Sequence, residues 1–118
     1  MSGSCLFCRI VSGEIPARKV YEDDEFLAFN DIQPQRPVHV LVIPKKHIAS
    51  LADASIGDAP VLGKMLVKAN EIAVAQGSPK GFRIIINTGE IGHQEVPHLH
   101  MHIVGGPDPV GPMLKKLQ

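Results

Sequence analysis

Three histidines at alternate positions are the strongest candidates for reactive side chains in this chain. They lie in the segment His98-Leu99-His100-Met101-His102, in which apolar residues separate them. Successive side chains of a β-strand point to opposite faces, so this spacing predicts three imidazoles in one row on one face. Imidazole changes charge near neutral pH, and such a row can bind metal, bind phosphate or transfer protons.

Three interpretations of this row follow from the residues alone. The first is a set of polar side chains on a half-exposed strand, which suits one histidine better than three in register. The second is a metal site, but the first and third imidazoles of one strand lie roughly 13 Å apart at ~3.3 Å per residue, too far for one ion. The third is chemistry on a phosphoryl group, in which histidine serves as a nucleophile or a proton donor.

The surrounding sequence predicts the short elements that position the row. Residues 5–12 are typical of a helical turn, which Gly13 ends. Strands are predicted at 19–21 and 26–29, joined by an acidic turn, and at 38–43, 82–87 and 99–104. A polar loop is predicted at 88–94 and an irregular tail at 105–111.

One long amphipathic helix is predicted from Ala59 to about Gln76. Asp58 is its expected N-cap, Pro60 lies in its first turn, and Gly77 is suited to end it. A period of 3.6 residues marks the buried stripe, which comprises Val61, Leu62, Met65, Leu66, Ala69, Ile72 and Ala73. Strand pairs joined by short turns, together with one long helix, predict an α+β fold with a mostly antiparallel sheet.

The composition indicates one globular domain without a strong surface charge. The 118 residues carry 12 basic and 12 acidic side chains, so neither nucleic acid nor an anionic membrane is an expected partner. No apolar run is long enough to cross a bilayer, and the N-terminus lacks the features of a secretory signal. The cytoplasm is therefore the expected location, and the two cysteines are expected to stay reduced there.

The histidine segment resembles the signature of the histidine-triad (HIT) family, in which histidines alternate with hydrophobic residues. Further blocks, in matching order and spacing, are similar to the Hint branch of this family: Ile15-Pro16-Ala17, Tyr21-Glu22-Asp23-Asp24, Ala28-Phe29-Asn30-Asp31-Ile32 and His39-Val40-Leu41-Val42-Ile43-Pro44-Lys45-Lys46-His47. The resemblance implies a single HIT domain over residues 1–118. It also implies a five-stranded, mostly antiparallel sheet with one long helix and a short N-terminal helix, and a homodimer in which two such sheets join.

Hint-like proteins are nucleotide phosphoramidases, which hydrolyse the P–N bond of purine nucleoside 5′-phosphoramidates such as AMP joined to a lysine amine. By this resemblance His100 is the nucleophile, and a nucleotidyl-histidine forms before water cleaves it. His102 is expected to donate to a phosphate oxygen, and His39 packs beside it, either as a core residue or with a direct catalytic role. Asn87 and nearby backbone N–H groups are expected to stabilise developing charge. The resemblance implies no cofactor requirement for catalysis.

The resemblance also implies a nucleoside site beside the N-terminal helical turn. Asp31 matches the carboxylate that binds the ribose, and apolar side chains match those that enclose the purine. The nucleotide-binding positions implied are Leu6, Phe7, Ile10, Phe29, Asn30, Asp31, Ile32, Asn87, Gln94, Val96, His100 and His102. From composition alone the apolar members would be core residues, and Asp31 would belong to a turn. The chain has no glycine-rich phosphate loop, so the histidines would have to hold the phosphate.

Cys5-Leu6-Phe7-Cys8 is a C-x-x-C pair with no strand before it, unlike a thioredoxin-like dithiol. Several HIT proteins bind structural zinc through such a pair and two histidines. The matching residues are Cys5, Cys8, His47 and His98. Two thiolates and two imidazoles would form a closed tetrahedral site. Two free buried thiols with two unrelated histidines are the alternative.

Other features of the resemblance concern the edge of the site. Glu95 stands where animal Hint proteins carry a serine that contacts the leaving group, and a carboxylate near phosphate is unfavourable, so Glu95 is assigned no catalytic role. His93 stands where glycine is common. The C-terminal segment of one family member often reaches the site of its neighbour, so Met113 and Leu114 are expected to contact the neighbour's substrate.

Two other classes of function stay open at this point. One is a dinucleoside polyphosphate hydrolase or a nucleotidyl transferase, enzymes of other HIT branches that keep the same nucleophile. The other is a nucleotide-binding scaffold protein.

Overall fold

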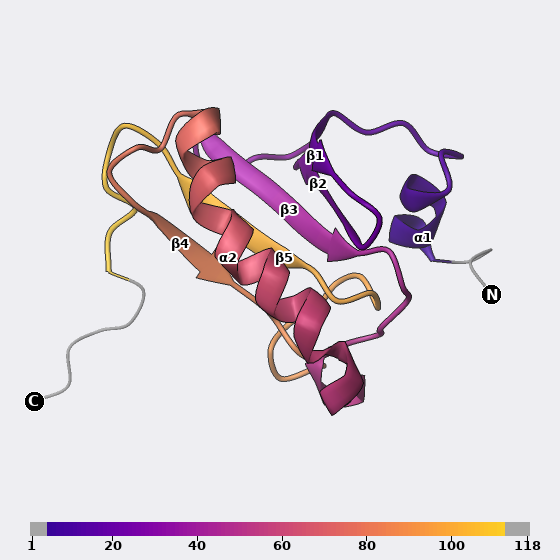
Figure 1. Ribbon diagram of the computed structural model, residues 1–118. Coiled ribbons are helices and arrows are strands. Elements are labelled where there is room, and N and C mark those ends of the chain that lie inside the picture. The colour runs from indigo at the N-terminus through magenta and orange to yellow at the C-terminus, as the bar shows by residue number, and fades with distance from the viewer. Residues whose placement is uncertain (1–4, 113–118) are drawn as a thin grey trace, which may run out of the picture.

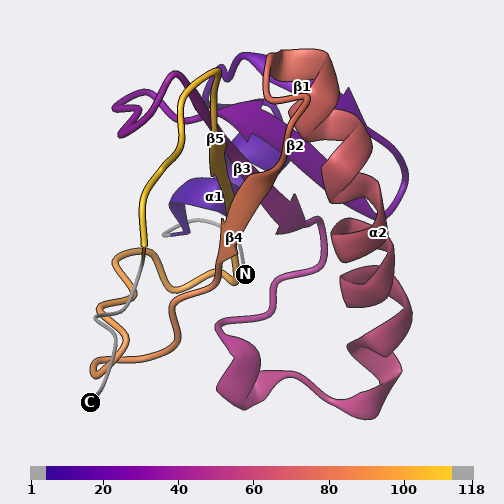
Figure 2. The same ribbon diagram turned by 90° about the vertical axis from the view of Figure 1, so that its left-hand side faces the viewer.

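A single antiparallel sheet organises the chain, of which the computed structural model describes residues 5–112. Its strands are β1 (Lys19–Glu22), β2 (Phe26–Asn30), β3 (Val38–Pro44), β4 (Phe82–Ile85) and β5 (Met101–Gly105), in the order β1-β2-β3-β5-β4. The helix α2 (Ala59–Gln76) crosses one face (Figure 1), and the short helix α1 (Leu6–Val11) lies by the opposite face (Figure 2). The predicted α+β fold with five antiparallel strands and one long helix is confirmed.

The alternation of side chains along the central strands separates two cores. Val40 of β3 packs in the core with α2, whereas Leu41 packs in the core with α1. β3 pairs with β5 so that Leu41 lies opposite His102. Because alternate residues share a face, His39 and His102 both lie on the α1 side of the sheet. These two histidines therefore lie on the adjacent strands β3 and β5, away from the helix that covers the larger core.

The helix α2 has the bounds that its sequence predicts. Its fully buried residues are Met65, Ala69, Ile72 and Ala73. The prediction is wrong for Leu66, which is 49% exposed because it lies at the margin of the stripe. Gly77 follows the helix with a φ of 114°, a left-handed conformation that glycine adopts without a steric penalty. No helix among residues 5–112 combines the length and the apolar character needed to cross a membrane.

The residue before α2, Asp58, makes no side-chain cap of that helix, contrary to the prediction. A short 3₁₀ helix (Ile56–Asp58) directly precedes α2, after another at Leu51–Asp53. The Asp58 carboxylate instead accepts from the backbone N–H of Ser55 at 2.9 Å and from Nζ of Lys46 at 2.7 Å. The carboxylate therefore closes the turn that leads into α2.

The histidine strand begins later than predicted, at Met101, so among the three histidines only His102 lies in it. Pro97 has no backbone N–H to donate. The N–H of Leu99 donates to the carbonyl oxygen of Ile48 at 2.7 Å, outside the strand ladder. The prediction that the strand begins at residue 99 is therefore wrong, but Leu99, Met101 and Ile103 all pack in the core with α2, so the three histidines keep to the opposite side.

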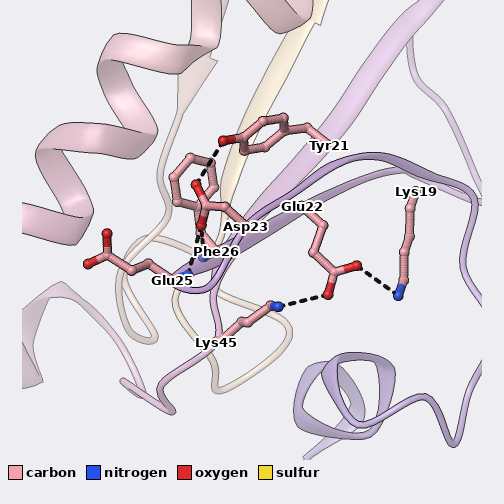
Figure 3. Close-up of polar contacts among 7 residues, drawn as sticks. All are labelled: Lys19, Tyr21, Glu22, Asp23, Glu25, Phe26 and Lys45. Atoms are coloured by element: carbon pink, nitrogen blue, oxygen red, sulfur yellow. Dashed lines mark hydrogen bonds and ion pairs between the residues drawn. The ribbon is translucent and has the colours of Figure 1, made fainter.

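The acidic turn between β1 and β2 is closed by the side chain of Asp23. Its Oδ1 accepts from the backbone N–H groups of Glu25 at 2.7 Å and Phe26 at 3.0 Å, and the Tyr21 hydroxyl donates to Oδ2 at 2.8 Å (Figure 3). In the same view the Glu22 carboxylate lies between two lysines. Exposed ion pairs contribute little, so Asp23 is the residue that shapes this turn.

Candidate active site and metal centre

The ring of His100 is oriented by a backbone hydrogen bond. Its Nδ1 lies 2.8 Å from the carbonyl oxygen of His98. A carbonyl oxygen only accepts, so Nδ1 carries the proton and the neutral ring keeps a lone pair on Nε2. His100 is 5% exposed and lines a cavity. This tautomer is the one in which Nε2 can act as a nucleophile.

A second chain of hydrogen bonds sets the tautomer of His102. The backbone N–H of Gln35 donates to Nδ1 of His39 at 3.0 Å, so the proton of neutral His39 is on Nε2. That Nε2 lies 2.9 Å from Nδ1 of His102 and donates to it. Neutral His102 therefore carries its own proton on Nε2. The rings of His100 and His102, whose centroids are 5.1 Å apart, thus offer one lone pair and one N–H donor.

The electrostatic surroundings keep His39 and His102 neutral near pH 7. Burial lowers the pKa of His39, although Asp31, whose Oδ2 lies 3.5 Å from Nε2, acts in the opposite direction. Burial, followed by the neighbouring imidazoles of His100 and His39, lowers the pKa of His102 to about 4. Asp31, His39 and His102 could also be read as metal ligands. The 2.9 Å between the two ring nitrogens is instead a hydrogen-bond distance.

A cavity of about 410 Å³ opens beside His100 and His102, within the size range of small-molecule sites. The residues proposed from the sequence that line it are Leu6, Phe7, Ile10, Phe29, Asn30, Asp31, Ile32, Val96, His100 and His102. The other lining residues, which were not predicted from the sequence, are Ile15, Pro16, Ala17, Gln33, Leu41 and Glu95. Two of the family-like blocks quoted above contain Ile15, Pro16, Ala17 and Leu41, and that signal could have identified them.

Asn87 lies outside this cavity. β4 ends at Ile85, two residues before the predicted end of the strand. Asn87 instead lines a neighbouring cavity of about 250 Å³, which shares His102 with the larger one and also contains Arg36 and Arg83. The structure therefore brings Asn87 near His102 from a different side than the apolar pocket.

The side chain of Gln94 is bonded to the backbone and lines neither of these cavities. Its Oε1 accepts from the N–H of Gly89 at 2.9 Å, and its Nε2 donates to the carbonyls of Ala49 at 2.7 Å and Val96 at 2.9 Å. Its own N–H donates to the carbonyl of Gly89 at 3.0 Å. Gln94 therefore ties the loop before the histidines to the segment after β3.

Two neighbours of Gln94 show how this loop departs from the family pattern. His93 has a φ of 59°, the left-handed region in which glycine is favoured, consistent with a position where glycine is common. Glu95 lines the larger cavity with a side chain that is 79% exposed, and its Oε2 lies 3.8 Å from Nε2 of His93. The carboxylate therefore lies at the solvent-exposed margin of the cavity.

The structure brings Cys5, Cys8, His47 and His98 together beside α1. The Sγ–Nδ1 distances are 3.3 Å for Cys5 to His98, 3.2 Å for Cys8 to His47 and 3.5 Å for Cys8 to His98, and the two Nδ1 atoms are 3.2 Å apart. A tetrahedral zinc ion with bonds of about 2.3 Å to sulfur and about 2.0 Å to nitrogen implies separations of about 3.5 Å and about 3.3 Å. The four residues therefore fit a zinc ion.

The protonation states of the His98 ring and the cysteine thiols also bear on whether this cluster can bind a cation. Nε2 of His98 lies 2.8 Å from the carbonyl oxygen of Pro44 and must donate to it, so Nδ1 presents its lone pair to the cluster. Burial lowers the pKa of His98, which favours the neutral ring that ligates metal. Burial and the neighbouring Cys5 raise the pKa of the Cys8 thiol to about 11. A divalent cation reverses that effect, because thiolate is the ligating form.

The fold and these side chains together define a class of protein, in which a five-stranded antiparallel sheet carries a histidine-lined cavity on the face opposite its long helix. Residues 12–108 match the family model described as the HIT domain. The chain therefore belongs to the histidine-triad family.

Relatives match over nearly the full length of the chain. Protein HitA of Neisseria gonorrhoeae is 54% identical over 104 residues, which cover 88% of this chain and 97% of the relative. The structure of a HIT family hydrolase from Clostridium thermocellum matches with a TM-score of 0.88 and 41% identity, over 95% of this chain and 98% of the other. A zinc-bound histidine triad family protein from Mycobacterium smegmatis matches with a TM-score of 0.77 and 37% identity, over 98% of this chain and 82% of the other.

Proposed function

We propose that this protein hydrolyses the P–N bond of purine nucleoside 5′-phosphoramidates, as in the Hint branch, through a nucleotidyl group held on His100. The observation that carries the proposal is the pair of tautomers in one cavity: a lone pair on Nε2 of His100 beside an N–H donor on Nε2 of His102. The related HIT family hydrolase from Clostridium thermocellum supports a hydrolytic reaction.

In the proposed reaction Nε2 of His100 attacks phosphorus and the P–N bond of the substrate breaks. The departing nitrogen takes up a proton and leaves as an amine. The N–H of His102 donates to a nonbridging phosphate oxygen, and a donor held in place before reaction stabilises the charge that develops there. Water then attacks phosphorus, breaks the bond to His100 and releases the nucleoside monophosphate.

The apolar part of the cavity supports a purine as the bound group. Phe7 and Phe29 pack edge to face with ring centroids 5.7 Å apart, and both line the cavity. Asp31 supplies an acceptor for ribose hydroxyls at the histidine end, because its Oδ2 lies 3.5 Å from Nε2 of His39. In this arrangement the purine packs against the aromatic rings, the ribose lies toward Asp31, and the 5′-phosphate lies next to His100.

A specific observation favours a second candidate, hydrolysis of dinucleoside polyphosphates. The neighbouring cavity that shares His102 is lined by Arg36 and Arg83, and arginine is a residue type that suits a longer phosphate chain. The two candidates differ in the bond that breaks, P–N in one and P–O in the other.

The test compares adenosine 5′-phosphoramidates of lysine and tryptamine with diadenosine tetraphosphate as substrates. We expect turnover of the phosphoramidates, loss of turnover in His100→Asn, and retained AMP binding by that variant in calorimetry. Rapid quenching followed by peptide mass spectrometry should find the nucleotide on His100. Preference for the tetraphosphate would select the second candidate. AMP binding by the wild-type protein without turnover of any of these substrates would indicate a scaffold protein.

The Cys5, Cys8, His47 and His98 cluster is proposed to hold structural zinc that takes no part in the reaction steps. Support comes from the ligand distances and from the zinc-bound relative of Mycobacterium smegmatis. Elemental analysis of protein purified without chelator should find one zinc per chain, and the variant Cys5→Ser should lose it. Wild-type protein without bound metal would contradict this proposal.

A homodimer that joins two sheets is proposed from the edge position of β4 and the exposed apolar side chains of α2. Val67 and Leu66 are 82% and 49% exposed. Light scattering should give a molecular mass twice that of one chain, and the substitution Val67→Glu should lower this measured mass. A monomer at micromolar concentration would contradict the proposal. Met113 and Leu114, expected to contact the neighbour's substrate, lie outside the described residues.

A further inference from the structure

His98 connects the Cys5, Cys8, His47 and His98 cluster directly to the proposed nucleophile. Its ring contributes Nδ1 to the cluster, 3.3 Å from Sγ of Cys5, while its Nε2 donates to the carbonyl of Pro44. Its backbone carbonyl accepts the Nδ1 proton of His100 at 2.8 Å. His98 is fully buried. A displacement of its ring from the cluster would therefore also shift the carbonyl that sets the tautomer of His100.

Phe7 makes a second connection between the cluster and the nucleotide cavity. The two cluster cysteines flank it in the sequence, and Sγ of Cys5 accepts from the backbone N–H of Cys8 at 3.3 Å at the start of α1. The Phe7 ring packs edge to face against His98, with centroids 5.9 Å apart, and against His100 at 5.2 Å. It also lines the nucleotide cavity. One buried ring therefore touches a cluster histidine, the proposed nucleophile and the proposed purine site.

The helix that carries Phe7 needs outside support to hold this position. α1 has 6 residues, and a helix of that length is not stable in water by itself. Within it, Leu6, Phe7 and Ile10 line the nucleotide cavity. A metal ion bound by Cys5 and Cys8 would link both ends of the first turn to His47 after β3 and to His98 before β5. If these residues of α1 are ordered before a nucleotide binds, binding loses less conformational entropy and is therefore tighter.

We propose that zinc bound by Cys5, Cys8, His47 and His98 acts as an effector of nucleotide binding, because it orders Phe7 and the carbonyl of His98 against the nucleotide cavity. This inference rests on the proposed function, since it needs the cavity to bind a nucleotide. His47 is exposed, so an ion can reach the cluster without global unfolding. Coupling between two sites is reciprocal: zinc raises the affinity for AMP by the same factor as AMP raises the affinity for zinc.

The first test measures the dissociation constant of AMP by calorimetry for zinc-loaded and chelator-treated full-length protein. We expect zinc to tighten AMP binding at least about fivefold, the lower limit of typical coupling between sites. Cys8→Ser should bind AMP weakly whether or not zinc is added. Ser78→Ala, a destabilised control at a residue that neither lines the nucleotide cavity nor belongs to the cluster, should keep the zinc effect. Equal AMP affinity of zinc-loaded and metal-free wild-type protein, both folded by circular dichroism, would overturn the proposal.

The second test uses only zinc-loaded protein as its starting material, and it therefore applies even if the metal-free protein does not fold. The dissociation constant of zinc is measured by competition with a chelator of known affinity, with and without saturating AMP, for the wild type and for Phe7→Leu. We expect AMP to tighten zinc binding at least about fivefold in the wild type and much less in the variant. An unchanged zinc affinity in the wild type would overturn the proposal. Equal tightening in both proteins would also overturn it, because it would indicate general stabilisation of the fold.

These measurements separate the coupling from the proposed function. AMP that binds and is coupled to zinc supports the inference even if no phosphoramidate is cleaved. AMP binding that is independent of zinc overturns the inference while the catalytic proposal stands. Failure of AMP to bind the zinc-loaded protein would overturn the proposed nucleotide site, and the effector role with it.

Discussion

Replacement of Gln94 by alanine should destabilise the protein, although this residue lines neither cavity beside His102. Its amide makes three hydrogen bonds to the backbone, with the N–H of Gly89 and the carbonyls of Ala49 and Val96. At about 1 kcal/mol each these bonds sum to about 3 kcal/mol. Gln94 is only partly buried, so water can replace some of them. We therefore expect Gln94→Ala to lower the free energy of unfolding by about 2 kcal/mol.

The assay is urea unfolding of zinc-loaded protein, followed by circular dichroism, with AMP affinity measured in parallel. Gln76→Ala, at an exposed position at the end of α2, is the matched control and should change stability by less than about 0.5 kcal/mol. Gln94→Ala should also weaken AMP binding, because Val96 lines the cavity and loses one of its anchors. Normal stability together with weakened AMP binding would refute the reasoning, since it would mean that the amide contacts the nucleotide directly.

Three further predictions concern stability. Burial lowers the pKa of His102 to about 4, so between pH 6.5 and 5 the unfolded chain takes up a proton there that the folded chain does not. The free energy of unfolding should therefore fall by about 1.6 kcal/mol over that range, and urea titrations should show a smaller fall in His102→Asn. Ser78→Ala should lower the free energy of unfolding by about 2 kcal/mol, because the buried hydroxyl donates to the carbonyl of Gly81 at 2.6 Å and accepts from the N–H of Gly106 at 2.9 Å. A decrease below about 0.5 kcal/mol in urea unfolding would contradict this prediction. Leu99→Ala should lower the unfolding free energy by about 2–5 kcal/mol, because Leu99 is 1% exposed, and an unchanged thermal midpoint would argue against this packing.

Patterns that depend on near neighbours were predicted correctly from the sequence. The bounds of α2 follow from its 3.6-residue period, from a proline in its first turn and from Gly77 after its last turn. The strands on either side of the acidic turn were also predicted, because short runs of strand-forming residues next to a cluster of acidic residues are a local signal. The family resemblance then selected most of the residues that line the nucleotide cavity.

The start of the histidine strand could not be predicted in the same way. The alternation of histidine and apolar residues continues through His98 and His100, so the local pattern carries no sign that pairing stops. The strand begins only at Met101 because the N–H of Leu99 donates to Ile48, a residue distant in the sequence. The hydrogen bonds of the Gln94 side chain could not be predicted for the same reason, because one of its partners, Ala49, lies 45 residues earlier in the sequence.

Most of the secondary structure, the family and the residue types available for chemistry can be predicted from the sequence, because periodicity, turn residues and spacing act over a few positions. Only the tertiary structure decided which ring nitrogens of His100 and His102 carry protons. The carbonyl of His98 fixes the proton of His100, and the hydrogen bonds from Gln35 to His39 and from His39 to His102 fix the proton of His102. Such bonds depend on distances and angles between residues that are far apart in the sequence. The tertiary structure also fixed the distances that the resemblance leaves open: Nδ1 of His98 lies 3.3 Å from Sγ of Cys5, while His100 and His102 line the cavity, because packing around α1 brings the cysteines to one end of the histidine segment.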